Sequence, residues 1–165
     1  MAIQAEERAE VGQRARGMAE WLALHHTYNA ILKETELALL PENLSLAQLR
    51  VLSVLKEAGD ILSTGEISRA IGKTSQPITG LVDGLEDQEL VQRHFDGRDR
   101  RKVWVRLTAK GLRKWEEAVR VANRLAEEVF SALTDGELRE LQAHTDELQT
   151  VATKRLAEAP GRSRF

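Results

Sequence analysis

Residues 99–108, with the sequence DRRKVWVRLT, restrict the fold of this chain more than any other segment. Their VWVRL stretch alternates aliphatic side chains with a tryptophan and an arginine, a period of two that predicts a strand. The threonine that follows suits the N-cap of a helix. An exposed loop rich in arginine has no role in packing. The guanidinium group of arginine loses its bound water more readily than an ammonium group does, and it therefore suits a narrow electronegative groove. These residues therefore predict the loop, strand and helix start of a DNA-binding wing.

The segments before this run complete the pattern of a winged helix. Residues 90–95 form a second strand candidate, and the loop at 96–102 is too polar to be core. Ahead of the hairpin, residues 63–71 and 74–86 predict two short helices joined by a turn at Gly72. Two such helices are typical of a helix-turn-helix, but many helical hairpins share that pattern. The hairpin that follows the second helix is what favours a winged helix-turn-helix.

Helical patterns dominate the rest of the chain. Apolar residues recur at three- and four-residue spacing over the ranges 5–40, 45–58, 108–133 and 134–160. Three predicted helices open with a capping box, in which a Ser or Thr precedes a Gln or Glu by three positions: Ser45 and Gln48, Ser63 and Glu66, Thr134 and Glu137. The predicted fold class is therefore mainly α with a small β-hairpin (α+β).

Charge is distributed unevenly along the 165 residues. The whole chain has a net charge of -2, but residues 63–114 hold 11 Lys and Arg against 7 Asp and Glu, a net charge of +4. The remaining residues hold 13 and 19 of these types, a net charge of -6. A basic central segment between acidic flanking segments favours a nucleic-acid-binding domain in the centre of the chain. The flanking helices would then have a different function.

Several classes of protein fit the sequence poorly. The chain has no cysteine, which excludes disulfides and thiolate metal sites, and no Gly-rich phosphate loop, metalloprotease motif or nucleophile elbow. Neighbouring His25 and His26 point about 100° apart on a helix and cannot easily chelate one metal together. No apolar run is long enough for a membrane span, and the acidic start resembles neither a secretion signal nor a membrane-surface helix. We expect a cytoplasmic protein that is not an enzyme and has no cofactor or metal.

The wing carries a signature through which the chain resembles the MarR family, the multiple antibiotic resistance regulators, from about Trp21 to Leu156. The signature is Asp-x-Arg, five residues, then Leu-Thr, and Asp99, Arg101 and Leu107-Thr108 meet it at every place. The resemblance implies that Arg101 enters the DNA minor groove and that Asp99 holds its guanidinium in position. The alternative is a solvated surface ion pair.

By the same resemblance, residues 74–86 are the recognition helix. Thr74, Ser75, Gln76 and Thr79 would contact phosphates or base edges in the major groove, and Gln76 is the best candidate for base readout because glutamine can pair with adenine. Thr74 or Ser75 could instead merely cap the helix.

The chain departs from the family pattern at three places. Gly80 and Gly84 stand where relatives often carry basic residues, and Glu89 stands at the usual glycine before the first wing strand. The two glycines remove phosphate contacts from the recognition helix. Affinity for DNA is therefore expected to depend more on the basic residues of the wing, which are Arg98, Arg100, Arg101 and Lys102.

The outer helices carry more apolar surface than a winged-helix core could cover, and in the family these ends interlock as a two-fold dimer. We therefore expect a winged helix-turn-helix domain embedded in an all-helical dimerisation domain. The expected division is 1–44 for the N-terminal dimerisation helix, 45–112 for the DNA-binding domain, 113–160 for the C-terminal dimerisation helices and 161–165 for a frayed tail. A homodimer implies a pseudo-palindromic double-stranded operator.

Family members often bind small aromatic or phenolic effectors near the junction of the dimer body and the winged domain. Trp21, His25, Tyr28 and Trp115 are the candidate ligand-binding residues, because aromatic faces and an imidazole suit such a compound. At helical spacing, however, Trp21 and Tyr28 are more often core or dimer contacts. The sequence thus favours a dimeric repressor released by a small aromatic ligand, with a winged-helix activator or a constitutive DNA-binding protein without ligand as the alternative.

Overall fold

The computed structural model describes residues 2–72, 78–95 and 103–158, with side chains from Gly17 onward. Several predicted contact residues lie outside these ranges: Thr74, Ser75 and Gln76 before the second helix of the helix-turn-helix, and Arg98, Asp99, Arg100, Arg101 and Lys102 in the wing. The expected tail at 161–165 also lies outside the described residues.

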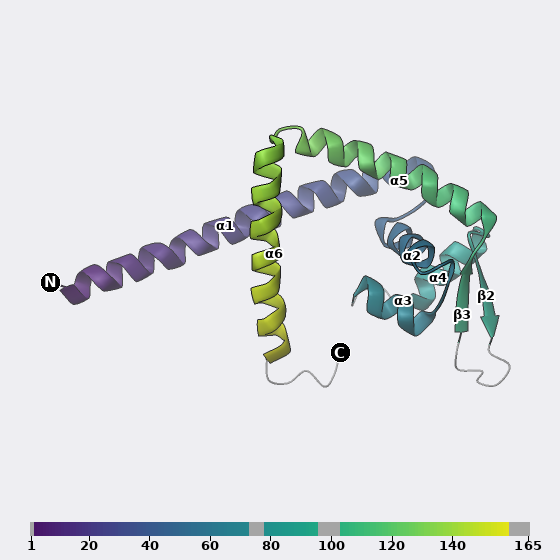
Figure 1. Cartoon of the computed structure of the whole chain (residues 1–165), viewed down its shortest axis with the longest axis horizontal. Helices are drawn as coiled ribbons and strands as arrows, with labels where there is room; N and C mark the ends of the chain where they lie inside the picture. The colour runs from purple at the N-terminus through teal and green to yellow at the C-terminus, as the bar shows by residue number, and fades with distance from the viewer. Residues whose placement is uncertain (1, 73–77, 96–102, 159–165) are drawn as a thin grey trace. The chain divides into compact units, whose positions relative to one another are not determined.

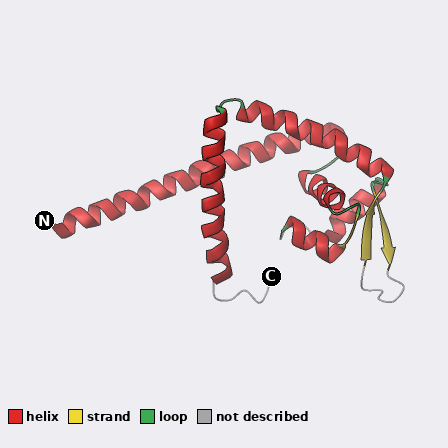
Figure 2. Cartoon of the chain, viewed as in Figure 1, coloured by secondary structure: helices red, strands yellow, loops and turns green. Residues whose placement is uncertain are grey.

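The described chain is mainly helical with a small sheet, which confirms the predicted fold class (Figures 1 and 2). In order, its elements are α1 (Ala2–Leu39), the short 3-10 helix η1 (Leu40–Glu42), α2 (Leu46–Glu57), β1 (Ile61–Ser63), α3 (Thr64–Ile71), α4 (Ile78–Asp87), β2 (Val91–Phe95), β3 (Val103–Leu107), α5 (Ala109–Phe130) and α6 (Asp135–Glu158). Backbone contacts divide the chain into two units, 1–125 and 126–165. The finer division into a DNA-binding domain and dimerisation segments stays a prediction.

The predicted capping boxes are present at the start of α2, α3 and α6. At α2, the Ser45 Oγ accepts from the backbone N–H of Gln48 at 3.1 Å, and the Gln48 Oε1 accepts from the backbone N–H of Ser45 at 2.9 Å. Ser63 and Glu66 make the same exchange at α3. Each pair satisfies two backbone groups that a helix start leaves without intrahelical partners, which is why these boundaries were readable from the sequence.

The sheet has three antiparallel strands in the order β1-β3-β2. The predicted hairpin is confirmed: Val91 pairs with Leu107 at one end and Phe95 with Val103 at the other. The short strand β1 adds to the far edge of β3, where Ile61 pairs with Arg106. The wing hairpin is therefore joined along one edge to β1, which leads directly into α3.

The core of the first unit lies between α2, α3, α4 and the sheet (Figure 1). Its fully buried large side chains are Leu39, Val51, Leu52, Leu55, Ile67, Val82, Leu85 and Val105. Leu39 is the one buried residue among the described side chains of α1. The last turn of this long helix thus joins the winged-helix core, while most of α1 extends beyond it.

The junction of β2, β3 and α5 is the tightest backbone approach in this unit. The Leu90 carbonyl accepts from the backbone N–H and the hydroxyl of Thr108, each at 3.1 Å. Thr108 caps α5 as predicted, because its Oγ1 accepts from the backbone N–H of Gly111 at 2.9 Å. A Cβ on Gly111 would overlap the Leu90 carbonyl oxygen and lie 2.9 Å from a methyl carbon of Leu107. Only glycine fits there without moving the strand.

The second unit holds the end of α5 and the whole of α6. A cavity of about 700 Å³ lies within it, lined mainly by apolar side chains that include Phe130, Leu133, Leu138 and Leu141. No described residue of α6 is buried, and Leu148 and Val151 are more than half exposed. Among the described helices of the chain, none is both long and apolar enough to cross a bilayer.

Candidate nucleic-acid interface

The second helix of the helix-turn-helix, α4, has one buried and one exposed face. Leu81, Val82 and Leu85 are buried against the core, and Thr79 on the outward side is exposed. Thr79 is thus the one predicted recognition-helix contact among the described residues, and its side chain faces solvent as that role requires. The first helix of the motif, α3, is held at its C-terminal end by Arg50 of α2, whose Nη2 donates to the Ile71 carbonyl at 2.9 Å.

Among the described residues of the wing, Arg93 on β2 links the hairpin to α4 through its side chain. Its guanidinium contacts the Asp83 carboxylate at 2.6 Å and the Glu86 carboxylate at 2.8 Å, and its Nη2 donates to the Thr79 carbonyl at 3.1 Å. Its backbone N–H also donates to Glu86 at 3.0 Å. The side chain is 17% exposed, so these charge-assisted hydrogen bonds are partly shielded from water. Arg93 therefore joins the second helix to the wing strand at three positions of the helix.

Sequence reasoning did not single out Arg93. Arg93 lies on a strand, and its partners lie on a helix seven to fourteen residues earlier in the chain. A helical or strand period relates only residues of one element, so neither period predicts these contacts. An arginine on a strand that follows a helix with two acidic residues three positions apart is a pattern that could have suggested these contacts.

The departures from the family pattern have clear structural settings. A Cβ at Gly80 would meet nothing within 4 Å, whereas a Cβ at Gly84 would lie 3.0 Å from the Gln48 Nε2. Glu89 has a φ of 61°, the left-handed conformation that glycine adopts without strain. Its carboxylate accepts from Lys110 at 2.8 Å, and this hydrogen bond and the charge of Lys110 hold the pKa of Glu89 below its usual value.

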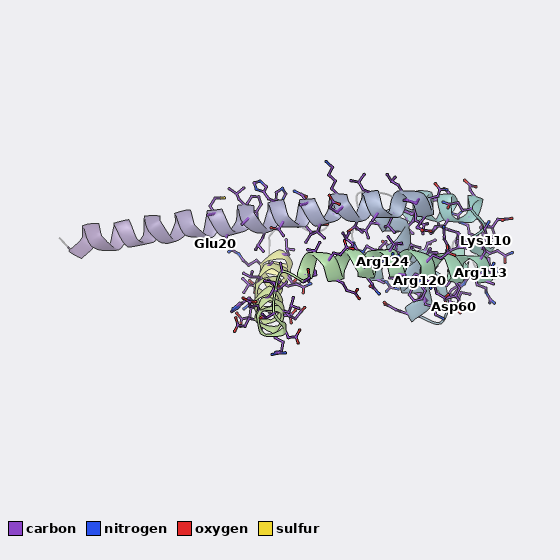
Figure 3. The ribbon with its side chains drawn as sticks, turned by 90° about the horizontal axis from the view of Figure 1, so that it is seen from above. Glu20, Asp60, Lys110, Arg113, Arg120 and Arg124 are labelled. Carbon is purple, nitrogen blue, oxygen red and sulfur yellow. The ribbon has the colours of Figure 1, made fainter. Side chains whose placement is uncertain are left out.

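A second ion pair ties α5 to the segment after α1. The Lys114 Nζ donates to the Glu42 carboxylate at 2.7 Å, and that hydrogen bond is the main reason why the pKa of Lys114 is raised. These two residues line a cavity of about 430 Å³ that also includes Gln88 and Arg113. Figure 3 places Lys110 and Arg113 together near the start of α5, with Arg120 and Arg124 farther along the same helix.

The candidate ligand-binding residues occupy two different settings. On α1, Trp21 and His25 stack with ring centroids 5.4 Å apart, the His25 imidazole lies 2.9 Å from the amide of Asn29, and Tyr28 is 64% exposed. Trp115 instead packs against the winged-helix core and donates its indole N–H to the Ser53 hydroxyl at 3.0 Å. The structure thus brings Trp21 and His25 together, while the described contacts of Trp115 are with the core.

A helix-turn-helix followed by an antiparallel hairpin that is anchored to its second helix is a winged helix-turn-helix, a class of DNA-binding domain. Residues 42–102 match the model of the MarR family. The HTH-type transcriptional repressor MdtR of Bacillus subtilis is 28% identical over 131 residues, which cover 79% of this chain and 84% of the relative.

Solved structures agree with these sequence matches. A transcriptional regulator of the MarR family from Rhodococcus sp. RHA1 is 25% identical with a TM-score of 0.67, and the match covers 79% of this chain and 89% of that one. The organohalide-sensing regulator RdhR-CbdbA1625, in its 2,4-dichlorophenol-bound form, has a TM-score of 0.75 over 90% of both chains; at 18% identity this likeness is one of fold. The chain is thus similar to the MarR family in residues 42–102 by sequence, and to transcriptional regulators over most of its length.

Proposed function

We propose that this chain is a homodimeric, sequence-specific repressor that acts in the cytoplasm and is released from DNA by a small aromatic ligand. The observation that carries the DNA-binding part is the Arg93 network, which presents α4 and the wing to a duplex as one body. The repressor part is supported by the match to MdtR across most of both chains.

In this proposal the two halves of the domain read adjacent grooves. The residues at and just before the start of α4 enter the major groove: Thr74, Ser75, Gln76 and Thr79. The wing residues Arg98, Arg100, Arg101 and Lys102 lie along the neighbouring minor groove, with Arg101 inserted and Asp99 positioning it. Gly80 has no side chain that could contact a phosphate, and the space around it is open. The wing therefore supplies a larger share of the affinity for DNA.

The proposal of a homodimer rests on the exposed apolar surface of the outer helices. On α1, Trp21 is 58% exposed, and on α6, Leu148 and Val151 are 56% and 58% exposed. Large apolar side chains repeated along helices are costly in water unless another surface covers them. A two-fold dimer would cover the same set in both copies and would require a pseudo-palindromic operator. Sedimentation equilibrium should give twice the chain mass.

For the effector, we propose a small planar aromatic compound bound beside the Trp21 and His25 stack, with Tyr28 one helical turn beyond. An exposed aromatic pair with an imidazole offers both a stacking face and a hydrogen-bonding group. The fold neighbour RdhR-CbdbA1625 is known with 2,4-dichlorophenol bound, which makes that compound a reasonable first probe. Trp115, the fourth candidate, would act through its packing against α2.

The decisive experiment measures DNA binding by wild type and by Arg101→Ala, with a duplex selected from a random pool by the wild-type chain. Arg101→Ala should weaken binding at least tenfold, because a groove contact of this kind contributes on the order of 1 to 3 kcal/mol. The matched control is Arg120→Ala, which removes the same charge from an exposed position on α5 (Figure 3). Equal binding by all three proteins at the same salt concentration would refute the role of the wing.

A phenol titration on the wild-type complex tests the ligand. Release of DNA by 2,4-dichlorophenol or a related phenol, lost in Trp21→Ala, is the expected result. Binding that persists at every phenol tested would favour the ligand-free alternative, an activator or a constitutive DNA-binding protein.

A further inference from the structure

Among the residues whose burial the structure describes, the most exposed large apolar side chain lies at the end of the first wing strand. Phe95, the last residue of β2, is 69% exposed, whereas Val91 on the same strand is 2% exposed. A phenyl ring left in water forfeits the free energy that burial would provide. Its position relative to α4 indicates what can cover it.

Phe95 lies on the face of β2 that is turned towards α4. Side chains at every second position of a strand share a face, so Val91, Arg93 and Phe95 point the same way. The first of these is buried in the core, and the second contacts Asp83, Glu86 and the Thr79 carbonyl of α4.

The contacts also show in which direction the strand follows the helix. Just before β2, the Leu90 backbone N–H donates to the Leu85 carbonyl near the end of α4. Two residues into the strand, the guanidinium of Arg93 reaches Thr79 in the first turn. Phe95 lies about 6 to 7 Å farther along the strand. It therefore lies beyond Arg93 on the side of the first turn of α4.

We propose that Phe95 packs against a deoxyribose of the DNA strand that separates the major groove read by α4 from the minor groove read by the wing. This contact rests on the proposed DNA-binding function. Between two adjacent grooves runs one sugar-phosphate backbone, and its sugars present C–H groups that an apolar ring can cover. The phosphates face basic and hydrogen-bonding groups instead. The ring thus adds affinity without reading sequence and without neutralising a phosphate.

This chemistry predicts a particular salt signature. Phosphate contacts by Lys and Arg release counterions, so their loss flattens the dependence of log K on log salt concentration. Loss of an apolar sugar contact lowers affinity equally at all salt concentrations. We expect Phe95→Ala to weaken binding about tenfold, which corresponds to about 1.4 kcal/mol, with an unchanged salt slope.

The experiment uses the full chain and the duplex that wild type selects from a random pool. Phe95→Leu keeps an apolar side chain and should bind within about threefold of wild type. Phe95→Thr keeps a strand-forming residue but not the apolar surface, and should bind as weakly as Phe95→Ala. The control is Leu40→Ala, which removes a 67% exposed apolar side chain from η1 and should bind as wild type does. Hydroxyl-radical footprinting at saturating protein should show one sugar per half-site that wild type protects and Phe95→Ala leaves open.

The outcomes separate this contact from the function on which it rests. If wild type binds and Phe95→Ala binds equally well, the contact is refuted and DNA binding stands. If Phe95→Thr binds as well as Phe95→Leu, the side chain serves only the strand and the contact is again refuted. If wild type selects no duplex, the proposed function fails and the contact fails with it.

Discussion

Replacement of Gly111 by alanine should destabilise the winged helix strongly, although alanine is the better helix former. The new Cβ would overlap the Leu90 carbonyl oxygen, which accepts two hydrogen bonds from Thr108. Displacing that carbonyl loses about 1 kcal/mol for each hydrogen bond, and forcing a methyl group into a packed site costs about 1 to 3 kcal/mol. The helix propensity of alanine returns about 1 kcal/mol. The net loss in free energy of unfolding is therefore about 2 to 4 kcal/mol.

The matched control is Gly80→Ala in α4, where nothing lies within 4 Å of a new Cβ. This variant should gain up to about 1 kcal/mol, because it has the same propensity benefit without the overlap. Urea unfolding followed by circular dichroism, at one fixed protein concentration, measures both values. If Gly111→Ala unfolds at the same urea concentration as Gly80→Ala, the close approach of α5 to Leu90 is not as described.

Three further predictions concern single contacts. Arg93→Gln should lower the free energy of unfolding by about 1 to 3 kcal/mol in the same assay, and Arg93→Lys should recover less than half of that, because an ammonium cannot span three acceptors. Trp115→Phe should cost about 1 kcal/mol, and the double variant with Ser53→Ala should cost little more than either alone, since both remove one hydrogen bond. The third involves Glu137, whose pKa is held below its usual value chiefly by the backbone N–H of Thr134. A glutamate whose pKa is lowered in the folded state stabilises the fold at pH values above the ordinary pKa of glutamate. This stabilisation is lost as the pH falls through the folded-state pKa. The difference in melting temperature between wild type and Glu137→Gln should therefore shrink from about pH 6 to about pH 3.

The boundaries of the helices were predictable because they depend on neighbours in sequence. A capping box such as Ser63 with Glu66 is complete within four residues, and the alternation of residues 103–107 needs only the strand itself. The left-handed backbone at Glu89 agrees with the glycine that relatives carry there, because glycine adopts this conformation without strain. In each case the physical cause lies within a few residues of the observed feature.

Features that depend on the meeting of distant segments were harder to predict. The hydrogen bond between Trp115 and Ser53, on α2, could not be predicted because the two residues lie 62 positions apart in the sequence. The salt bridges of Arg93 and the exposed side chain of Phe95 follow from the packing of a strand along a helix, which no periodicity encodes. The contacts at Gln76 and Arg101 remain predictions, as they lie outside the described residues.

The three attachment points of Arg93 along α4 have a consequence for the genetics of this regulator. A helix that one arginine contacts at residues 79, 83 and 86 resists sliding or turning against the strand that carries the arginine, so the proposed ligand would release DNA by moving the helix and the strand together. Alleles that abolish the response to a signal while preserving operator recognition should therefore fall outside residues 78–107. Alleles that break the attachment of the strand to α4 should weaken operator recognition itself, and a suppressor of an Arg93 allele should restore that attachment.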